Sequence, residues 1–340
     1  MNETDSTPMS VSEIRPETLM EEQAKAYVED ILNLLKHKEK FVKVLCPACG
    51  SMNNHEVFEK FHLSYTECNF CETLFINPRP TPEILDEYYK KSKNYWYWNK
   101  YIFPITENNR RTKIFQPRAQ KIAKICEKYH AKQNTLLEVG AGFGTFCEEI
   151  KKLELFSNVI AVEPTPELAE TCRTKGLTVI EKPIEQVHLK QESVDVVVSF
   201  EVIEHLFDPK EFLKRCASVL SPEGLLILSC PNNKGFDIVV LQEISDSIDG
   251  EHLNYFNTTS LSYLVKTLGF EILEVTTPGK LDAELVRKKI LNHEFDVNDN
   301  PFLKYILLDR WDDVGLSFQQ FLADNQLSSH LWLVARKREV

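Results

Sequence analysis

The stretch Thr135-Leu136-Leu137-Glu138-Val139-Gly140-Ala141-Gly142-Phe143-Gly144-Thr145-Phe146 decides the fold of this chain. Its first five residues form a short apolar run that predicts a buried strand, and a helical pattern begins after Gly144. Three alternating glycines join these two elements. Glycine lets a backbone come close to a ligand, and a helix N-terminus offers free N–H groups. The stretch therefore predicts a ligand-binding turn between a strand and a helix.

The spacing of the glycines separates two kinds of cofactor. A dinucleotide-binding turn reads G-x-G-x-x-G and would need glycine at position 145, where this chain has Thr145. The chain instead reads E-x-G-x-G-x-G from Glu138 to Gly144. Taken alone, this pattern also fits a tight strand–helix turn that binds nothing. The residues that follow in the chain are needed to choose between a ligand-binding turn and a turn without a ligand.

The downstream chain continues the alternation of strands and helices. Apolar runs predict further strands over 159–162, 177–180, 194–200, 225–229, 271–276 and 330–336. Helical patterns cover 115–129, 166–175 and 212–220. The run 194–200 is nearly all apolar, as expected of a central strand covered on both faces. We therefore expect an α/β fold with helices on both faces of the sheet.

Acidic and histidine residues follow two of these strands. Glu163-Pro164 closes the second expected strand, where a carboxylate can accept hydrogen bonds from both ribose hydroxyls of a nucleoside. The central strand is followed by Glu201-Val202-Ile203-Glu204-His205. Because Glu163 stands at a strand end, it is expected beside the glycine turn.

These motifs, in this order from about residue 115 to 338, resemble the class I S-adenosylmethionine (SAM)-dependent methyltransferases. The resemblance implies a Rossmann-like sheet of seven strands whose last strand, 330–336, is antiparallel and lies beside the sixth. It also implies SAM as the cofactor. The residues that the resemblance places against SAM are Glu138, Gly140, Gly142, Phe143, Gly144, Glu163, Pro164, Ile184, Phe200 and Glu201.

A methyltransferase of this kind must place a nucleophile in line with the S–CH₃ bond and remove its proton. The loop Glu251-His252-Leu253-Asn254-Tyr255 is expected at the ligand-binding edge of the sheet. We predict His252 as the base, Glu251 as its orienter or an alternative base, and His205 as the next candidate. The alternative for His252 is a loop histidine that only caps a helix or binds backbone.

Two C-x-x-C pairs precede the catalytic region. Cys46 and Cys49 are separated from Cys68 and Cys71 by 18 residues, the arrangement of a four-cysteine zinc ribbon. Four protein ligands close the coordination sphere, so the predicted role of Zn²⁺ is structural. The segment between the pairs alternates in the manner of a β-hairpin, and its histidines are expected on the surface.

The order of ribbon, Asn77-Pro78-Arg79-Pro80 linker and catalytic region points to a smaller group of proteins than the methyltransferase motifs alone. It resembles a bacterial subgroup that modifies sugars and surface polysaccharides, including C-methyltransferases of deoxysugar nucleotides. That resemblance implies a sugar nucleotide or glycan precursor as the acceptor and adds Tyr255 to the catalytic candidates. The subgroup's longer Tyr-x-x-x-Glu-His pattern is only partly present, so C-methylation and O-methylation both stay open.

The chain divides into four expected parts. Residues 1–40 hold a tail, with 1–13 expected to be disordered, and an amphipathic helix from 16 to about 37. Residues 41–80 form the ribbon, and 81–114 form an aromatic-rich helical linker or lid. Residues 115–340 form the methyltransferase domain, with a helical insertion at about 280–325. The aromatic segment either packs on the catalytic domain or closes over the cofactor, with Arg110 or Arg111 holding an anion.

Composition and charge limit the partners. The net charge is −11 and the isoelectric point is about 5.4, which disfavours unselective binding to nucleic acid. Glutamates also outnumber lysines in the ribbon. An RNA methyltransferase and a non-catalytic scaffold remain the alternative functions. The spacing of the cysteines is typical of a reducing cytoplasm. The polar, acidic N-terminus does not resemble a signal peptide, and no apolar run is long enough to span a membrane. The oligomeric state is not predicted.

Overall fold

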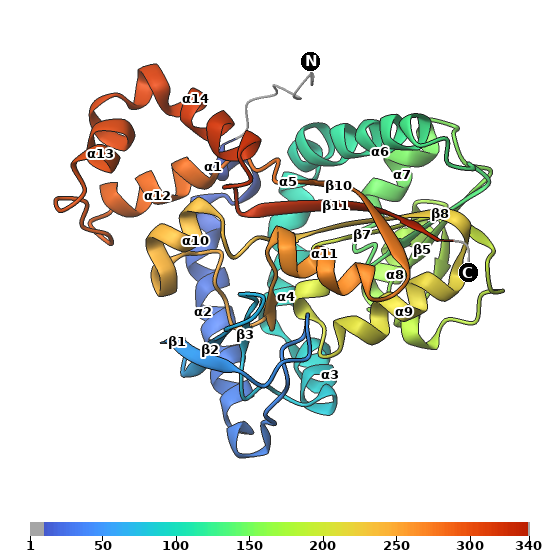
Figure 1. Ribbon diagram of the computed structural model, residues 1–340, viewed down its shortest axis with the longest axis horizontal. Coiled ribbons are helices and arrows are strands. Elements are labelled where there is room, and N and C mark those ends of the chain that lie inside the picture. The colour runs from blue at the N-terminus through green and yellow to red at the C-terminus, as the bar shows by residue number, and fades with distance from the viewer. Residues whose placement is uncertain (1–9, 339–340) are drawn as a thin grey trace.

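A computed structural model describes residues 10–338 (Figure 1). Its main sheet has the strand order β10-β11-β8-β7-β4-β5-β6. The strands are β4 (Thr135–Val139), β5 (Asn158–Val162), β6 (Thr178–Ile180), β7 (Val194–Phe200), β8 (Leu220–Pro231), β10 (Phe270–Thr276) and β11 (His330–Lys337). Strand β11 is antiparallel to both β8 and β10, and the pairs among β4 to β8 are parallel. This confirms the predicted seven-stranded fold and the insertion of the last strand beside the sixth.

Helices cover both faces of this sheet, as predicted. They are α6 (Gln116–Lys128), α7 (Thr145–Lys152), α8 (Pro166–Thr174), α9 (Pro209–Val219) and α11 (Thr258–Lys266). Side chains alternate between the two faces along β8. Leu225 and Ile227 pack in the apolar cluster that includes α6 and α7, whereas Leu226 and Leu228 pack in the cluster that includes α9 and α11. The sheet thus separates two continuous apolar layers.

A second, four-stranded sheet forms the ribbon, in the order β1-β2-β3-β9. Its strands are β1 (Asn54–Lys60), β2 (Leu63–Cys68), β3 (Leu74–Ile76) and β9 (Asn254–Tyr255). Strands β1 and β2 form the predicted hairpin. Strand β9 comes from the loop after His252, and Phe75 of β3 pairs with Asn254. The ribbon and the predicted catalytic loop therefore share a sheet, and the domain boundaries themselves stay a prediction.

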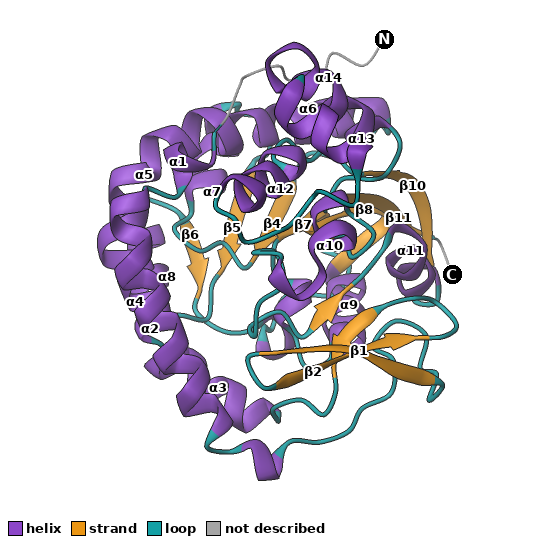
Figure 2. Cartoon of the chain, turned by 90° about the vertical axis from the view of Figure 1, so that its left-hand side faces the viewer, coloured by secondary structure: helices purple, strands orange, loops and turns teal. Residues whose placement is uncertain are grey.

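The N-terminal helices and the aromatic segment run along one side of the molecule (Figure 2). They are α1 (Val11–Ile14), α2 (Glu17–Leu35), α3 (Pro82–Lys91), α4 (Lys93–Tyr97) and α5 (Phe103–Arg110), with short turns η1 (Lys38–Lys40), η2 (Trp98–Ile102) and η3 (Arg111–Phe115). The predicted disorder of residues 1–13 is wrong for Val11 to Glu13, which lie in α1. The Glu13 carboxylate accepts from the backbone N–H of Ser10, and Asn109 Nδ2 donates to the Glu13 carbonyl. Residues 1–9 lie outside the described part.

The C-terminal insertion forms a helical lobe beside α10 (Figure 1, upper left). Its elements are α12 (Asp282–Leu291), α13 (Pro301–Lys304), η7 (Tyr305–Asp309) and α14 (Trp311–Asp324), and α10 (Phe236–Leu241) packs against α12. The remaining short turns are η4 (Ile184–Gln186), η5 (Ile203–His205) and η6 (Gln242–Ile244). Leu241, Val286, Leu307 and Leu322 belong to an apolar cluster of this lobe. Among residues 10–338, no helix has the length and apolar character needed to cross a membrane.

Candidate active site

The three glycines of the turn after β4 all have positive φ, at 79°, 55° and 69° for Gly140, Gly142 and Gly144. A Cβ atom on Gly140 would lie 2.4 Å from Val202 Cγ2, and one on Gly144 would lie 2.6 Å from Leu177 Cδ1. A Cβ on Gly142 would meet nothing within 4 Å. Close packing therefore requires glycine at positions 140 and 144. Gly142 borders open space in which a ligand can lie.

Glu163 lies beside this turn at the end of β5. Its Oε2 accepts from the backbone N–H of Gly142 at 2.8 Å, and its Oε1 accepts from that of Thr165 at 2.9 Å. Burial raises the pKa of Glu163, and the two N–H donors act against that shift. Each carboxylate oxygen keeps a second lone pair for a ribose hydroxyl. Pro164, next in the chain, is exposed.

Glu138 is buried within β4. Burial raises its pKa to about 8, and the Cys147 thiol donates to Oε2 at 2.9 Å. Phe143 stacks face to face on Phe103 of the aromatic segment, with ring centroids 3.4 Å apart. Ile184 is packed in the core layer of α9. The predicted cofactor residues thus lie around the glycine turn, in the flanking strands and in the core beneath them.

Arg118 of α6 joins these groups, and sequence reasoning missed it. Its guanidinium lies over the ring of Phe200, 4.3 Å from the centroid, and its charge interacts with Glu138 and Glu201. Within residues 10–338 this guanidinium makes no hydrogen bond. The helical pattern of 115–129 gave no signal for it, because an arginine on a helix is usually a solvated side chain.

Glu201 follows β7 with a φ of 56°. Ser229 Oγ donates to its Oε1 at 2.6 Å, and His330 Nδ1 lies 3.4 Å from the same oxygen. Burial raises the pKa of Glu201, but the His330 charge and the Ser229 hydroxyl outweigh it and lower the pKa overall. Glu201 is therefore an ionised carboxylate at the sheet edge.

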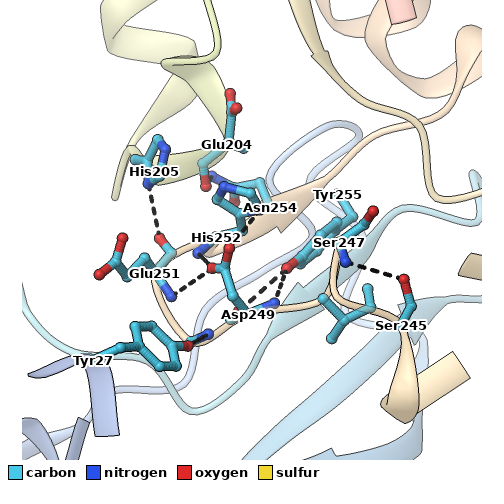
Figure 3. Close-up of polar contacts among 12 residues, drawn as sticks. Tyr27, Glu204, His205, Ser245, Ser247, Asp249, Glu251, His252, Asn254 and Tyr255 are labelled. Carbon is cyan, nitrogen blue, oxygen red and sulfur yellow. Dashed lines mark hydrogen bonds and ion pairs between the residues drawn. The ribbon is translucent and has the colours of Figure 1, made fainter. Parts of the chain in front are cut away.

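The four predicted catalytic residues lie close together (Figure 3). The rings of His205 and His252 have centroids 4.6 Å apart, and those of His252 and Tyr255 are 5.5 Å apart. His205 Nδ1 lies 3.2 Å from the Glu251 carbonyl oxygen. Because His205 follows Val202, which touches the glycine turn, this cluster and the glycine turn border the same edge of the sheet.

Glu251 and Tyr255 are less open than His252. Glu251 Oε1 accepts from Tyr88 Oη at 2.6 Å and from Asn94 Nδ2 at 3.0 Å, and burial raises the pKa of Glu251 to about 7. The Tyr255 hydroxyl is bonded to the backbone of Asp249. These contacts suit Glu251 and Tyr255 to holding the loop in place.

The loop depends on side chains from the N-terminal third of the chain. Tyr27 of α2 accepts from the Gly250 N–H at 2.6 Å, and Tyr65 of the ribbon donates to the Asp249 carbonyl at 2.7 Å. Asp249 Oδ1 accepts from the N–H groups of Glu251 and His252. The sequence carried no signal for the two tyrosine contacts, because they join residues 223 and 184 positions apart.

The four cysteines predicted to bind metal converge in the ribbon. Their sulfur atoms lie within 4.8 Å of one another, with Cys46 and Cys71 at 3.4 Å and Cys49 and Cys68 at 3.5 Å. All nine cysteines of the chain are free thiols. Four thiols at these separations fit a tetrahedral Zn²⁺ with bonds of about 2.3 Å.

The aromatic segment borders this region, but its arginines are already engaged. Arg111 pairs with Glu107, Glu148 and Glu149, and Arg110 Nη2 donates to the Ile14 carbonyl at 2.8 Å. These partners leave little reason to assign either residue an anionic ligand. A pocket of about 220 Å³ lies between this segment and the turn after Glu163. Its lining includes Tyr89, Lys90, Lys91, Lys93, Trp96 and Thr165.

Comparison with known sequences shows what the region around the glycine turn is similar to. Residues 108–275 match the profile of a family described as "Methyltransferase domain". Most of the main sheet thus lies in a region that is similar to a methyltransferase domain. A Mycobacterium tuberculosis protein named "Probable S-adenosylmethionine-dependent methyltransferase" is 29% identical over 178 residues, which are 52% of this chain and 62% of that relative. The methyltransferase match thus spans less than two thirds of the relative's length.

Two further relatives belong to the same comparison. A "Ubiquinone biosynthesis O-methyltransferase" of Bradyrhizobium diazoefficiens is 32% identical over 114 residues, covering 31% of this chain and 44% of the relative. A solved structure of Haemonchus contortus phosphoethanolamine N-methyltransferase 2 with SAM superposes with a TM-score of 0.43 at 16% identity, covering 62% of this chain and 50% of that one.

Proposed function

We propose that this protein transfers the methyl group of SAM to a hydroxyl, or a carbon, of a small-molecule acceptor, most specifically a sugar nucleotide or glycan precursor. The observation that carries the proposal is the meeting of two elements at one sheet edge. The glycine turn packs against Val202, and three residues later His205 lies against His252. A methyl donor in the turn would therefore face the histidine pair.

The residues present fit SAM. The open space beside Gly142 can take the methionine part of the cofactor, and Glu163 can accept from its ribose hydroxyls. Arg118, which lacks a hydrogen-bond partner among the described residues, suits the methionine carboxylate, because a guanidinium binds a carboxylate through paired N–H groups. Bound SAM supplies an electrophilic methyl group on its sulfonium.

The acceptor side belongs to the loop around His252. The His252 side chain is 18% exposed and its Nδ1 lies 3.4 Å from Asp249 Oδ2. The imidazole has a ring nitrogen that can accept the acceptor's proton, and the Asp249 carboxylate can orient the ring. Glu251, held by Tyr88 and Asn94, positions the loop and is the alternative base.

The pocket next to the aromatic segment supports a phosphorylated sugar as the acceptor. Trp96, Lys90, Lys91 and Lys93 are among the residues that line this pocket. These lysines pair with exposed carboxylates, which are weak interactions that a phosphate can replace. The segment would then serve as the lid of the site.

The cysteine cluster completes the proposal as a structural Zn²⁺ site. The thiol usage supports a cytoplasmic location for the protein, because nine free cysteines persist in a reducing compartment.

Label transfer from methyl-labelled SAM tests the function. The acceptor panel holds nucleotide sugars, catechols and other phenols, and total bacterial RNA. Label in a sugar nucleotide supports the proposal, whereas label only in RNA or a phenol overturns the acceptor class. Failure to bind S-adenosylhomocysteine would leave the scaffold alternative.

His252→Gln should keep the affinity for S-adenosylhomocysteine and lose turnover by about 10²-fold or more, and the exposed His188→Gln should match wild type.

A further inference from the structure

The Glu204 carboxylate is an anomaly in the site described above. It is fully buried in η5, and neither carboxylate oxygen has a hydrogen-bond partner among residues 10–338. Burying an ionised carboxylate without a partner is strongly unfavourable. A neutral carboxyl group would still leave its O–H without an acceptor. The side chain therefore lacks the group that its position requires.

Two histidines supply the rest of a ligand set. One ring nitrogen of His205, one of His252 and a Glu204 carboxylate oxygen all lie within 4.8 Å of one another. The three side chains come from two segments, η5 and the loop before β9, which Figure 3 shows side by side. Two imidazoles and one carboxylate are a common protein ligand set for divalent transition-metal ions that keep open coordination positions.

The contacts around the histidines match those of metal ligands. A metal-bound histidine usually directs its other ring nitrogen to a carbonyl or a carboxylate. His205 Nδ1 lies 3.2 Å from the Glu251 carbonyl, and His252 Nδ1 lies 3.4 Å from Asp249 Oδ2. The His205 contact leaves Nε2 of that ring for a cation, and the buried Nδ1 of His252 has no hydrogen-bond partner among the described residues.

We infer that Glu204, His205 and His252 bind a divalent transition-metal ion whose open coordination positions take the acceptor's oxygen. In a tetrahedral site, ligand atoms about 2.1 Å from the metal lie about 3.4 Å from one another. Movements of about 1 Å in the ligand atoms, through side-chain rotation, would bring these three residues to such separations. The cation balances the buried Glu204 charge. The nearby carboxylates of Glu201 and Asp249, which both interact with Glu204, favour a cation at this place.

This inference rests on the proposed methyl transfer and changes how it proceeds. An acceptor hydroxyl bound to the cation has a lower pKa and releases its proton to water. The freed oxygen lone pair then forms the O–CH₃ bond, and the electron pair of the S–CH₃ bond returns to sulfur, giving S-adenosylhomocysteine. His252 acts here as a ligand and not as the base, and O-methylation is favoured over C-methylation.

Mn²⁺ is a probe that separates this site from the cysteine cluster. Thiolates prefer Zn²⁺, whereas imidazole and carboxylate ligands accept Mn²⁺. The full chain, with zinc retained in the ribbon, is titrated with Mn²⁺ while the electron paramagnetic resonance signal of the free ion is recorded. Wild type and His188→Gln should bind one Mn²⁺ per chain. Glu204→Gln and His252→Gln should bind at least about tenfold more weakly.

Two further readouts keep the test decisive if a variant folds poorly. Bound Mn²⁺ in the wild type should show nitrogen modulation from imidazole. Saturating Mn²⁺ should raise the melting temperature of wild type but not of Glu204→Gln, which without metal should melt at or above wild type because it removes a buried charge. No bound Mn²⁺, no nitrogen modulation, or equal affinity in Glu204→Gln would overturn the site.

Binding of S-adenosylhomocysteine is measured on the same samples. Cofactor binding and label transfer without Mn²⁺ binding would remove the metal site and leave the proposed function standing. Mn²⁺ binding without cofactor binding or label transfer would leave the site and remove the proposed function.

Discussion

Arg79 Nη1 donates to Asn254 Oδ1 at 3.0 Å, and both side chains are fully buried. Arg79 lies where the chain leaves the ribbon, and Asn254 lies two residues after His252. Asn254 Nδ2 also donates to the Leu206 carbonyl at 2.8 Å, next to His205. One hydrogen-bonded pair therefore connects the ribbon exit, the turn that carries Glu204 and His205, and the loop that carries His252.

Arg79→Met should lower the free energy of unfolding by about 2–4 kcal/mol, because it leaves buried acceptors on Asn254 and two backbone carbonyls without a donor. Turnover should fall at least tenfold while the affinity for S-adenosylhomocysteine changes little. Urea unfolding and binding calorimetry measure both effects, with the exposed Arg173→Met as the control. A double-mutant cycle with Asn254→Ala should show coupling, and additive effects would contradict the link.

Removal of the metal expected in the ribbon should also affect the loop that carries His252. Cys71→Ser should lower the zinc content and loosen β3, which pairs with β9 near His252. Asn257 Nδ2 donates to the Cys71 carbonyl at 3.0 Å, so the start of α11 should loosen as well. Zinc analysis and hydrogen exchange over 251–260 measure these changes. Cys126→Ala, a buried cysteine outside the cluster, should retain zinc, and unchanged exchange in Cys71→Ser would contradict the coupling.

Alanine at Gly142 should weaken cofactor binding more than it weakens the fold. Its positive φ costs about 1 kcal/mol for alanine, and the added methyl group enters the open space beside the turn. Gly176 has a similar φ and equally open surroundings, so Gly176→Ala is a matched control that should keep cofactor affinity.

Gly144→Ala should instead lose about 1–3 kcal/mol more stability than either variant, because its methyl group overlaps Leu177 and Cys172. Thermal unfolding and titration with S-adenosylhomocysteine separate these effects. Equal cofactor affinity in Gly142→Ala and Gly176→Ala would remove the glycine turn from the cofactor site.

Arg118→Met should lower the affinity for S-adenosylhomocysteine about tenfold, because the cofactor's carboxylate would lose its charge-assisted hydrogen bonds. The flexible methionine keeps the apolar contact with Phe200. Lys121 lies on the same helix with its Nζ 3.9 Å from the Trp332 ring centroid, so Lys121→Met is the matched control. Calorimetry at two salt concentrations measures the change, and an unaltered affinity in Arg118→Met would assign the carboxylate to another residue.

Glu138 should make stability depend on pH. Burial raises its pKa to about 8, above the ordinary value of 4.5, so the folded state keeps a proton that the unfolded state loses between these values. Stability from this group is therefore present below pH 4.5 and falls as pH rises toward 8. Glu138→Gln should reduce this dependence. The difference in the free energy of unfolding between the two pH values should shrink by an amount on the order of a few kcal/mol at most. Urea unfolding at pH 5 and pH 8 measures it, with the exposed Glu170→Gln as the control. An equal slope in both variants would contradict the raised pKa.

The sequence alone determined the main architecture, because that information is local. Alternating apolar runs and helical periods located the seven strands and their helices, and the E-x-G-x-G-x-G turn located the candidate site for a ligand. The C-x-x-C pairs likewise brought four thiols to one point, since each knuckle is a local structure. The disorder expected for 1–13 was wrong at its end, because α1 is held by α5, a contact that periodicity cannot reveal.

Only the tertiary structure decided how the acceptor side is assembled. It placed His205 against His252, fixed Glu251 with Tyr88 and Asn94 from the aromatic segment, and joined the ribbon to the loop through Arg79 and Asn254. It also revealed that the Glu204 carboxylate is buried without a partner among the described residues. These relationships depend on contacts between segments far apart in the chain. A sequence read in short windows carries the period of each element, but it does not carry the distance between two side chains on different elements.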